Sequence, residues 1–253
     1  MSTHPSDVAI VILAAGLGTR MKSNNAKVLH EIMGRPMILY VVETAQSIVG
    51  NNIVVVVGHQ AEKVKDTVAA RGDLHYAYQE RQLGTGHAVM CAMSSLPKGI
   101  RHVVILCGDV PLLQEETLRR FLDDYRSQSR TLSILAVNLD NPRGYGRIVQ
   151  GQDGSVTGIV EEADATTEQR TIALVNTGIY CVSKDFLTEA LMQLSDDNAQ
   201  GEYYLTDIVR TAHQAQLSIG VSIGSDPDEF VGINSREQLE AVERIMRSRL
   251  AGI

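Results

Sequence analysis

Short apolar runs alternate with amphipathic stretches along the first half of the chain. The runs at residues 8–13, 53–57 and 103–106 are rich in β-branched residues and have the length of buried strands. Between and after them, apolar residues recur at helical spacing over about residues 37–49, 62–70, 87–95 and 115–125. This alternation predicts a doubly wound α/β fold, in which a parallel sheet carries helices on both faces.

The pattern changes in the second half of the chain, from Ser133 onward. Shorter strand-like runs lie there at residues 134–137, 147–149 and 156–160. Residues 151–154 contain two glycines and an aspartate, which is typical of a hairpin turn. We interpret this part as a β-rich lobe inserted into the fold, followed by a last amphipathic helix at about residues 235–250.

Size, charge and cysteine content narrow the possible functions. A chain of 253 residues can bury one substantial core, which predicts one main domain. Its net charge of -7 argues against a nucleic-acid partner, since such binding needs a surplus of Lys and Arg. The three cysteines are widely spaced and odd in number, which is typical of a reducing cytoplasm rather than of a disulfide framework. No apolar run approaches the roughly 20 residues that cross a bilayer, so we expect a cytoplasmic protein with no membrane partner.

The first strand leads into a glycine-rich loop, Leu13-Ala14-Ala15-Gly16-Leu17-Gly18-Thr19-Arg20-Met21, with Lys27 six residues further on. Backbone N–H groups in such a loop can point at phosphate oxygens. Arg20 and Lys27 add two cations beside it, which favours chemistry in which negative charge builds on phosphoryl groups.

Other glycine-rich loops fit this segment less well. A dinucleotide-binding fingerprint needs a third glycine for helix packing and an acid at the end of the second strand, where this chain has Gly58-His59. A Walker loop needs Gly-Lys-Ser or Gly-Lys-Thr, and neither triplet occurs in the chain. A plain strand-to-helix turn explains the glycines but not the paired cations.

Three further segments carry candidate chemistry near predicted strand or helix ends. Residues 79–87 contain glycines that allow close backbone approach, and Thr85 could cap the next helix. Asp109 follows a buried strand, where it could hold a hard cation or merely form a turn. Asn234 precedes the last helix, and with Glu237 three residues on it is more readily explained as a helix cap.

Five segments, in the same order along the chain, resemble the sugar-phosphate nucleotidyltransferases. They are the first loop with Lys27, Gln-Leu-Gly-Thr-Gly-His at 82–87, Gly-Asp-Val-Pro at 108–111, Gly-Tyr-Gly-Arg-Ile at 144–148 and Asn-Ala-Gln-Gly-Glu-Tyr-Tyr-Leu-Thr-Asp at 198–207. The likeness covers nearly the whole chain and is closest to the uridyltransferase domain of the bifunctional N-acetylglucosamine-1-phosphate uridyltransferase/glucosamine-1-phosphate acetyltransferases.

The resemblance implies a Rossmann-like, doubly wound fold with a mixed, mainly parallel sheet and an inserted β-rich sugar-binding lobe. It divides a single domain over residues 1–253 into a nucleotide-binding half (about 1–130), the lobe (about 131–233) and a C-terminal helix (about 234–253). No left-handed β-helix repeats follow Ile253. Because relatives trimerise largely through that β-helix, we expect a monomer.

The resemblance also assigns roles to individual residues. Arg20 and Lys27 are expected to be catalytic contacts to phosphate, and Asp109 and Asn234 to share a Mg²⁺ ion. Two protein ligands suit magnesium, which usually keeps waters and takes substrate phosphate oxygens. The nucleotide is expected to contact Leu13, Ala14, Ala15, Gly16, Gln79, Gly84 and Thr85.

The sugar is assigned by the same resemblance to Gly146, Glu161 and Asn176. Taken alone, each of these has a simpler explanation: a turn glycine, a solvated charge at a strand end and an amide that satisfies local backbone groups. The implied reaction is transfer of a uridylyl group from UTP to N-acetylglucosamine 1-phosphate. Transfer to another sugar 1-phosphate or from another nucleotide, and a non-catalytic nucleotide-sugar sensor, remain open alternatives.

Two positions depart from the family pattern. Ala26 stands where a proline usually precedes the lysine, so the loop that carries Lys27 lacks a residue that would restrict it. Cys107 stands where a tyrosine often precedes Gly-Asp-Val-Pro, and a thiol cannot supply the same phenolic contact. Nothing near Cys107 in the sequence marks it as an activated thiolate.

Overall fold

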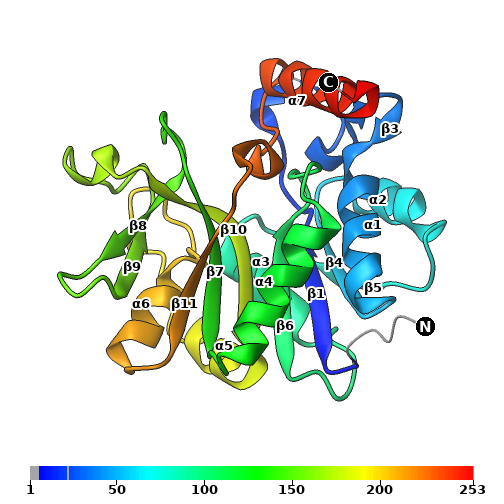
Figure 1. Cartoon of the computed structure of the whole chain (residues 1–253). Coiled ribbons are helices and arrows are strands. Elements are labelled where there is room, and N and C mark those ends of the chain that lie inside the picture. The colour runs from blue at the N-terminus through cyan, green and yellow to red at the C-terminus, as the bar shows by residue number, and fades with distance from the viewer. Residues whose placement is uncertain (1–5, 22, 253) are drawn as a thin grey trace.

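The computed structural model describes residues 6–21 and 23–252 and is built around a nine-stranded mixed sheet (Figure 1). The main path of the sheet runs in the order β11-β7-β10-β6-β1-β4-β5. Its parallel part consists of β1 (Val8–Leu13), β4 (Ile53–Val57), β5 (His75–Tyr78) and β6 (His102–Cys107). Beyond β6 lie β10 (Leu174–Ser183), which is antiparallel to both of its neighbours, then β7 (Leu132–Asn138) and β11 (Ile219–Ile223). The sheet is therefore mixed and mainly parallel on the β1 side, as the sequence predicts.

Helices cover both faces of the sheet, because its central strands are apolar at nearly every residue and successive residues face opposite sides. Ile10 and Ile12 of β1 belong to the core on one face, whereas Ala9 and Val11 belong to the core on the other. The first core packs against α1 (Met37–Val49), α2 (Ala61–Ala69), α4 (Glu115–Ser127) and α7 (Arg236–Ala251). The second packs against α3 (Thr85–Met93), α5 (Lys184–Leu191) and α6 (Asp207–Gln214).

The β-rich part is smaller than predicted. We expected residues 134–137 to open a separate lobe, but they belong to β7 in the central sheet, between β10 and β11. The segment that leaves the main path is the hairpin of β8 (Gly146–Gln150) and β9 (Val156–Val160). Its turn closes where the Gly151 N–H donates to the Ser155 carbonyl at 2.8 Å, which confirms the predicted hairpin. A two-stranded sheet of β2 (Glu31–Ile32) and β3 (Arg35–Pro36) lies beneath α7. The division of the chain into a nucleotide half, a lobe and a C-terminal helix stays a prediction.

The first helix has the predicted bounds, whereas a predicted cap of a later helix is wrong. Pro36 is the N-cap residue of α1, where its fixed φ precedes the first turn. Gly50 closes that helix with φ of 60°. The N-cap of α3 is Gly84, so Thr85 is the first helical residue and its hydroxyl accepts from the Leu205 N–H instead of capping.

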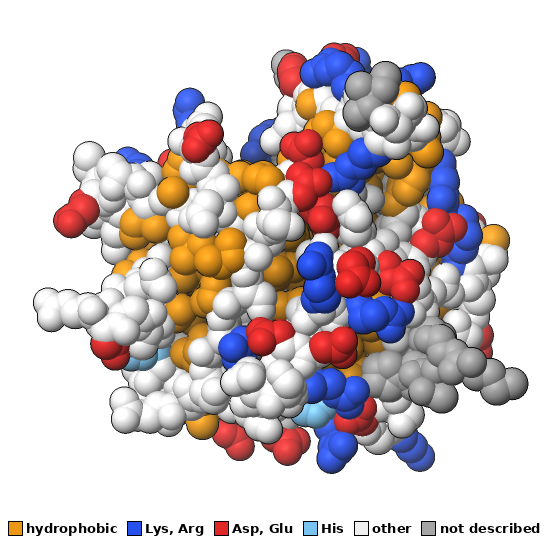
Figure 2. All heavy atoms as spheres, in the orientation of Figure 1, with side chains coloured by type: hydrophobic (Ala, Val, Ile, Leu, Met, Phe, Trp, Pro, Cys, Tyr) orange, Lys and Arg blue, Asp and Glu red, His pale blue; other side chains and the backbone are white. Residues whose placement is uncertain are grey.

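The outer surface carries charges of both signs. On the face in Figure 2, Lys and Arg side chains are interspersed with Asp and Glu, without a field of one sign. That nucleic acid is not a partner stays a prediction from the net charge of -7. Within residues 6–21 and 23–252, no helix combines the length and apolar character that crossing a membrane requires.

Candidate functional site

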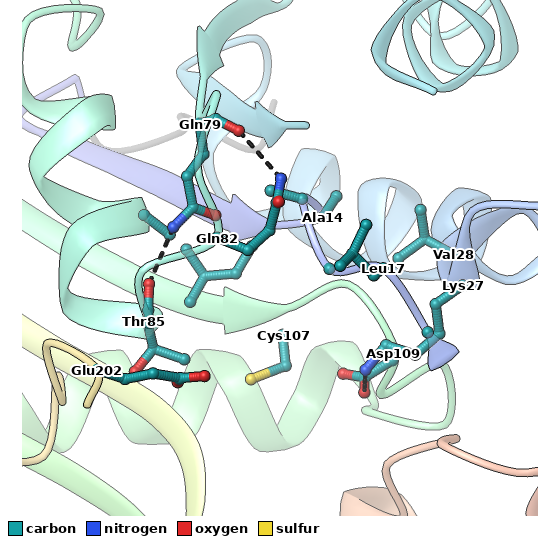
Figure 3. A pocket seen from close by; sticks show the side chains of 16 residues that line it. Ala14, Leu17, Lys27, Val28, Gln79, Gln82, Thr85, Cys107, Asp109 and Glu202 are labelled. Carbon is teal, nitrogen blue, oxygen red and sulfur yellow. Dashed lines mark hydrogen bonds and ion pairs between the residues drawn. The ribbon is translucent and has the colours of Figure 1, made fainter. Parts of the chain in front are cut away.

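A cleft of about 460 Å³ opens at the edge of the sheet where the parallel strands β1 and β6 end (Figure 3). Ligands in open α/β sheets bind at this edge. Nine of the predicted site residues line the cleft: Leu13, Ala14, Ala15, Gly16, Lys27, Gln79, Gly84, Thr85 and Asp109. The cleft therefore collects the predicted nucleotide residues of two loops, whose glycines Gly16 and Gly84 are 68 positions apart in the sequence.

The shape of the first loop depends on Gly18. Its φ of 65° lies in the left-handed region, and a Cβ there would come within 2.7 Å of the Lys27 Cβ. A Cβ at Gly16 would lie 4.0 Å from the Lys27 Cε. The glycines thus let the stem of Lys27 pass against the loop, and its ammonium group reaches the cleft.

The predicted catalytic and metal residues form one cluster. The Lys27 Nζ lies 2.5 Å from Asp109 Oδ2 and 3.1 Å from Asn234 Oδ1, and an Arg20 Nη donates to the same Asn234 oxygen at 2.9 Å. The side chains of Lys27 and Asp109 are 19% and 14% exposed, so this ion pair is only partly hydrated. These contacts join Lys27 to residues that are 82 and 207 positions away in the sequence.

This donor set fits a hard divalent cation. A carboxylate oxygen and an amide oxygen converge on the same ammonium group, and such oxygens are the ligands that Mg²⁺ takes together with waters and phosphate oxygens. No cluster of three or more His, Cys, Asp or Glu residues suited to a metal occurs in the described part of the chain. Asp109 and Asn234 are accordingly the residues that would hold the ion.

The start of α7 places Asn234, and not in the way the local sequence favours. Taken alone, the local sequence favours Asn234 as the helix cap, but Ser235 is the N-cap and its Oγ accepts from the Gln238 N–H at 3.3 Å. The Gln238 Oε1 in turn accepts from the Asn234 N–H at 2.7 Å. This reciprocal pair resembles a capping box shifted by one residue. It leaves the Asn234 carboxamide free of capping and directed at Arg20 and Lys27.

At the opposite end of the cleft, Gln79 is buried and held by its amide nitrogen. Its Nε2 donates to the Gly84 carbonyl at 3.0 Å and lies 3.1 Å from His87 Nδ1. His87 therefore orients Gln79. The Gln82 Nε2 donates to the Gln79 carbonyl at 3.2 Å (Figure 3).

The segment at residues 198–206 docks onto this glycine loop. The Gly86 N–H donates to the Tyr203 carbonyl and the Tyr203 N–H to the Leu83 carbonyl, both at 2.8 Å. A Cβ at Gly84 would lie 2.6 Å from the Tyr203 carbonyl oxygen, so only glycine permits this approach. The docking brings Glu202 to the wall of the cleft.

The three predicted sugar residues also come together, beside the cleft and not in its lining. Gly146 of β8 pairs with Asn176 of β10, and a Cβ at Gly146 would lie 3.4 Å from a Glu161 carboxylate oxygen. Burial raises the pKa of Glu161, and the nearby acids Asp164, Asp207 and Glu202 add to the rise, while a hydrogen bond from the Thr206 hydroxyl opposes it. Gly146 is therefore a strand residue rather than a turn glycine, and Glu161 is not a fully solvated charge, whereas the Asn176 Oδ1 does accept from a local backbone group, the Gly178 N–H, at 3.0 Å.

Cys107 lies on the floor of the cleft, between Asp109 on one side and Thr85 with Glu202 on the other (Figure 3). Burial raises the pKa of its thiol to about 12, and the charge of Asp109 adds to the rise. The group therefore stays a neutral thiol near pH 7, which supports the prediction that it is not a nucleophile.

Among the polar residues of the lining, Gln82 and Glu202 are not in the set of site residues predicted from the sequence. Both lie in segments that carried the family resemblance, so the signal was present. Glu202 lies in the loop that precedes α6, which begins at Asp207. Only the docking of that loop on Gly84 shows that Glu202 faces the cleft.

Comparisons with known proteins agree with this geometry. A model of the MobA-like NTP transferase domain matches residues 10–202, which include β1, the first loop, the end of β6 and the β8–β9 hairpin. Among curated proteins, the bifunctional protein GlmU of Geotalea uraniireducens is 48% identical over 245 residues, or 97% of this chain and 54% of that protein. GlmU of Geobacter metallireducens is 47% identical over 244 residues, or 96% of this chain and 51% of that protein. The chain thus spans about half the length of the curated relatives it matches.

A solved structure shares the fold at low sequence identity. It is described as a glucose-1-phosphate thymidylyltransferase from Bacillus anthracis in complex with sucrose. It superposes with a TM-score of 0.76 over 95% of both chains, at 18% identity. At that identity, the match supports the mixed α/β architecture alone.

Proposed function

The chain belongs to the family of MobA-like NTP transferase domains, a family of nucleotidyltransferases, and from that membership we propose that it transfers the uridylyl group of UTP to N-acetylglucosamine 1-phosphate. The family implies nucleotide and sugar phosphate substrates and generally uses a divalent metal ion. The choice of uridine and of the acetylated sugar rests on the likeness to GlmU proteins over 97% of the chain. The observation that carries the proposal is the cluster of Arg20, Lys27, Asp109 and Asn234 at the mouth of the cleft.

In the proposed reaction, an oxygen of the sugar 1-phosphate attacks the α-phosphorus of UTP. The bond from that phosphorus to the β-phosphate oxygen breaks, so the products are UDP-N-acetylglucosamine and pyrophosphate. A phosphate monoester has a second pKa of about 6, so the attacking oxygen is already largely ionised near neutrality. No side chain is needed as a general base, which agrees with a thiol at Cys107 whose pKa is about 12.

The main task of the protein is to bring two anions together and to stabilise the charge of the leaving group. Backbone N–H groups of the first loop would bind the nucleotide phosphates, with Arg20 and Lys27 neutralising the charge that develops on them. Asp109 and Asn234 would hold Mg²⁺, which when bound screens the phosphates and helps to align them. Gln79, Gly84 and Thr85 would contact the uracil end, and Gly146, Glu161 and Asn176 the sugar.

The test is Mg²⁺-dependent pyrophosphate release, measured with UTP, CTP and dTTP against N-acetylglucosamine 1-phosphate, glucosamine 1-phosphate and glucose 1-phosphate. We expect release chiefly with UTP and the acetylated sugar. Release with a different pair would retain a nucleotidyltransferase and overturn the proposed specificity. No release with any pair would favour a nucleotide-sugar sensor.

A pair of aspartate variants makes the assay specific to the cluster. Asp109→Asn removes the carboxylate that contacts Lys27, whereas Asp123→Asn makes the same change on the exposed face of α4. We expect the first to reduce turnover by at least about 10²-fold and the second to leave it unchanged.

The protein is further proposed to be cytoplasmic and monomeric.

A further inference from the structure

Tyr180 of β10 carries a buried hydroxyl that the fold leaves unused. The side chain is 1% exposed, and no group among the described residues meets hydrogen-bonding geometry with its oxygen. Buried phenols usually have a partner, because leaving one unpaired costs the hydration it loses. A partner for Tyr180 is therefore expected in some state of the protein.

Strand register places this hydroxyl next to the cleft. Tyr180 is paired with Ile105 of β6, and Cys107 lies two residues further along the same face of β6. The Cys107 thiol packs over Gly178, where a Cβ would come within 2.8 Å of the sulfur. Tyr180 thus lies on the same face of the sheet as Cys107 on the cleft floor, opposite the residue two positions before that cysteine.

The surroundings of the hydroxyl are the side chains proposed to bind the sugar. Burial raises the pKa of Tyr180 well above its usual value, the charge of Glu161 raises it further, and the nearby Asn176 side chain opposes the rise. Asn176 is close enough to act on the phenol, although the two groups miss hydrogen-bonding geometry in this conformation. A small rotation of either side chain would join them.

The existing contacts of Asn176 decide what such a bond would do. Its Oδ1 accepts from the Gly178 N–H at 3.0 Å, while its Nδ2, which carries two N–H donors, meets hydrogen-bonding geometry with none of the described residues. A hydrogen bond from one Nδ2 donor to the Tyr180 oxygen would fix the plane of the carboxamide, and a donor is what opposes the rise in the pKa of this phenol. The second Nδ2 donor would then be held ready for a carbonyl acceptor such as an acetamido group.

We propose that Tyr180 is a positioning residue for the acceptor sugar: its phenol oxygen accepts from Asn176 Nδ2 when the sugar binds and so orients the second N–H of that amide toward the acetamido carbonyl. This inference rests on the proposed function.

Tyr180→Phe removes the hydroxyl and nothing else. We expect KM for N-acetylglucosamine 1-phosphate to rise about five- to tenfold, as for the loss of one neutral hydrogen bond, with kcat and KM for UTP within about twofold of wild type. The preference for the acetylated over the non-acetylated sugar should fall by a similar factor. Calorimetry should show weaker binding of UDP-N-acetylglucosamine and unchanged binding of UMP.

Thermal stability separates this role from a merely structural one. Because the hydroxyl has no partner in the free protein, Tyr180→Phe should leave Tm unchanged or raise it. The matched control is Tyr125→Phe, which also removes a buried phenol hydroxyl, one that lies 2.9 Å from His102 Nδ1. That variant should lower Tm and leave both KM values unchanged.

A double-variant cycle tests whether Tyr180 acts through Asn176. If it does, Tyr180→Phe should add little to the loss already caused by Asn176→Ala. An unchanged acceptor KM in Tyr180→Phe, or equal losses added in the double variant, would overturn the inference. A wild-type protein that prefers another sugar would contradict the proposed function separately, and the cycle would then be read with that sugar's KM.

Discussion

Lys27 is the residue on which the charges of the site converge. Its ammonium group contacts both Asp109 and Asn234, the two side chains that would hold a divalent cation. The ammonium group of Lys27 therefore contacts the same two oxygens that a divalent cation would take. Ala26 stands where the family usually has proline, so the backbone before Lys27 is less restricted. We expect this freedom to let Lys27 move from these oxygens to a phosphate.

Arg20 is expected to contribute mainly to turnover. It is exposed and donates to Asn234 Oδ1, so it is available to a leaving pyrophosphate. We predict that Arg20→Ala lowers kcat by about 10²-fold, the cost of one preorganised charge donor, and changes KM for the sugar less than about threefold. Arg120→Ala on the exposed face of α4 is the matched control in steady-state kinetics. An unchanged kcat in Arg20→Ala would exclude a catalytic role.

Glu161 makes stability depend on pH. Burial raises its pKa in the folded protein, so below the unfolded pKa both states are protonated, and stability is lost as pH rises through the folded pKa. Glu161→Gln stays neutral, so its Tm should exceed that of wild type by a few degrees near pH 7 and match it near pH 4. Melting curves across this range measure the difference.

The neighbouring Glu162 provides a control of opposite sign. Hydrogen bonds from the Gly144 N–H and from the buried Arg147 lower its pKa, so its contribution is present above the unfolded pKa and lost as pH falls. Glu162→Gln should therefore melt below wild type near pH 7 and approach it at low pH. If both variants followed the same trend with pH, the burial of Glu161 would not be the cause.

Among individual residues, the sequence predicts those whose neighbours lie in the same loop. The glycines, Arg20 and Lys27 of the first loop are recognisable together because they lie within 15 residues of one another. Asn234 is different, since its local sequence fits a helix cap and its role depends on contacts more than 200 residues away. Glu202 and Tyr180 were not singled out for the same reason: their neighbours come from other strands and loops.

At the level of elements, periodicity predicted the central strands and their helices well. The bounds of β1, β4 and α1 agree with the sequence interpretation at every residue. The strand β10 was not assigned, because Asn176, Thr177 and Gly178 interrupt its apolar run, and these residues form a bulge against β7. The interruption coincides with Asn176, which is proposed to bind the sugar, so the break in the pattern falls at a proposed functional residue of the strand.

The docking of residues 198–206 on α3 can be tested at Gly84. Its φ is 107° and a Cβ there would lie 2.6 Å from the Tyr203 carbonyl oxygen, so Gly84→Ala should push away the loop that carries Glu202. We predict a loss of activity of at least about tenfold and a destabilisation above the roughly 1 kcal/mol expected from the left-handed φ alone.

Gly99→Ala is the matched control for this change. Gly99 also has a positive φ, of 84°, but no atom lies within 4 Å of its Cβ position. It should share the backbone strain and keep full activity. If the two variants lost activity equally, close approach of the 198–206 loop would not be the reason for glycine at position 84. Denaturant unfolding and initial rates distinguish these outcomes.

In the whole molecule, the site joins parts of the chain that no single element contains. The first loop follows β1, Asp109 follows β6, and Asn234 precedes α7, which packs on the far end of the core. The sheet order, with β6 next to β1, brings the first two together, and the Ile233 N–H donates to the Asp109 carbonyl at 3.0 Å, which fixes the third. Ligand binding at this junction should therefore stabilise the fold as a whole.

The size of that stabilisation should reveal how Lys27 and the metal share Asp109 and Asn234. At 100 times its Kd, a ligand of the folded state adds about 2.7 kcal/mol, which corresponds to about 5–10 °C in Tm for a chain of this size. We predict that Mg²⁺ alone shifts Tm little in wild type, because Lys27 already neutralises Asp109 and contacts Asn234. Mg²⁺ and UTP together should raise Tm by more than the sum of the shifts that each causes alone, since the phosphates give Lys27 a new partner. Lys27→Met should respond to Mg²⁺ alone more strongly than wild type, whereas Lys63→Met on the exposed face of α2 should behave as wild type. A large shift with Mg²⁺ alone in wild type would show that Lys27 does not compete with the ion.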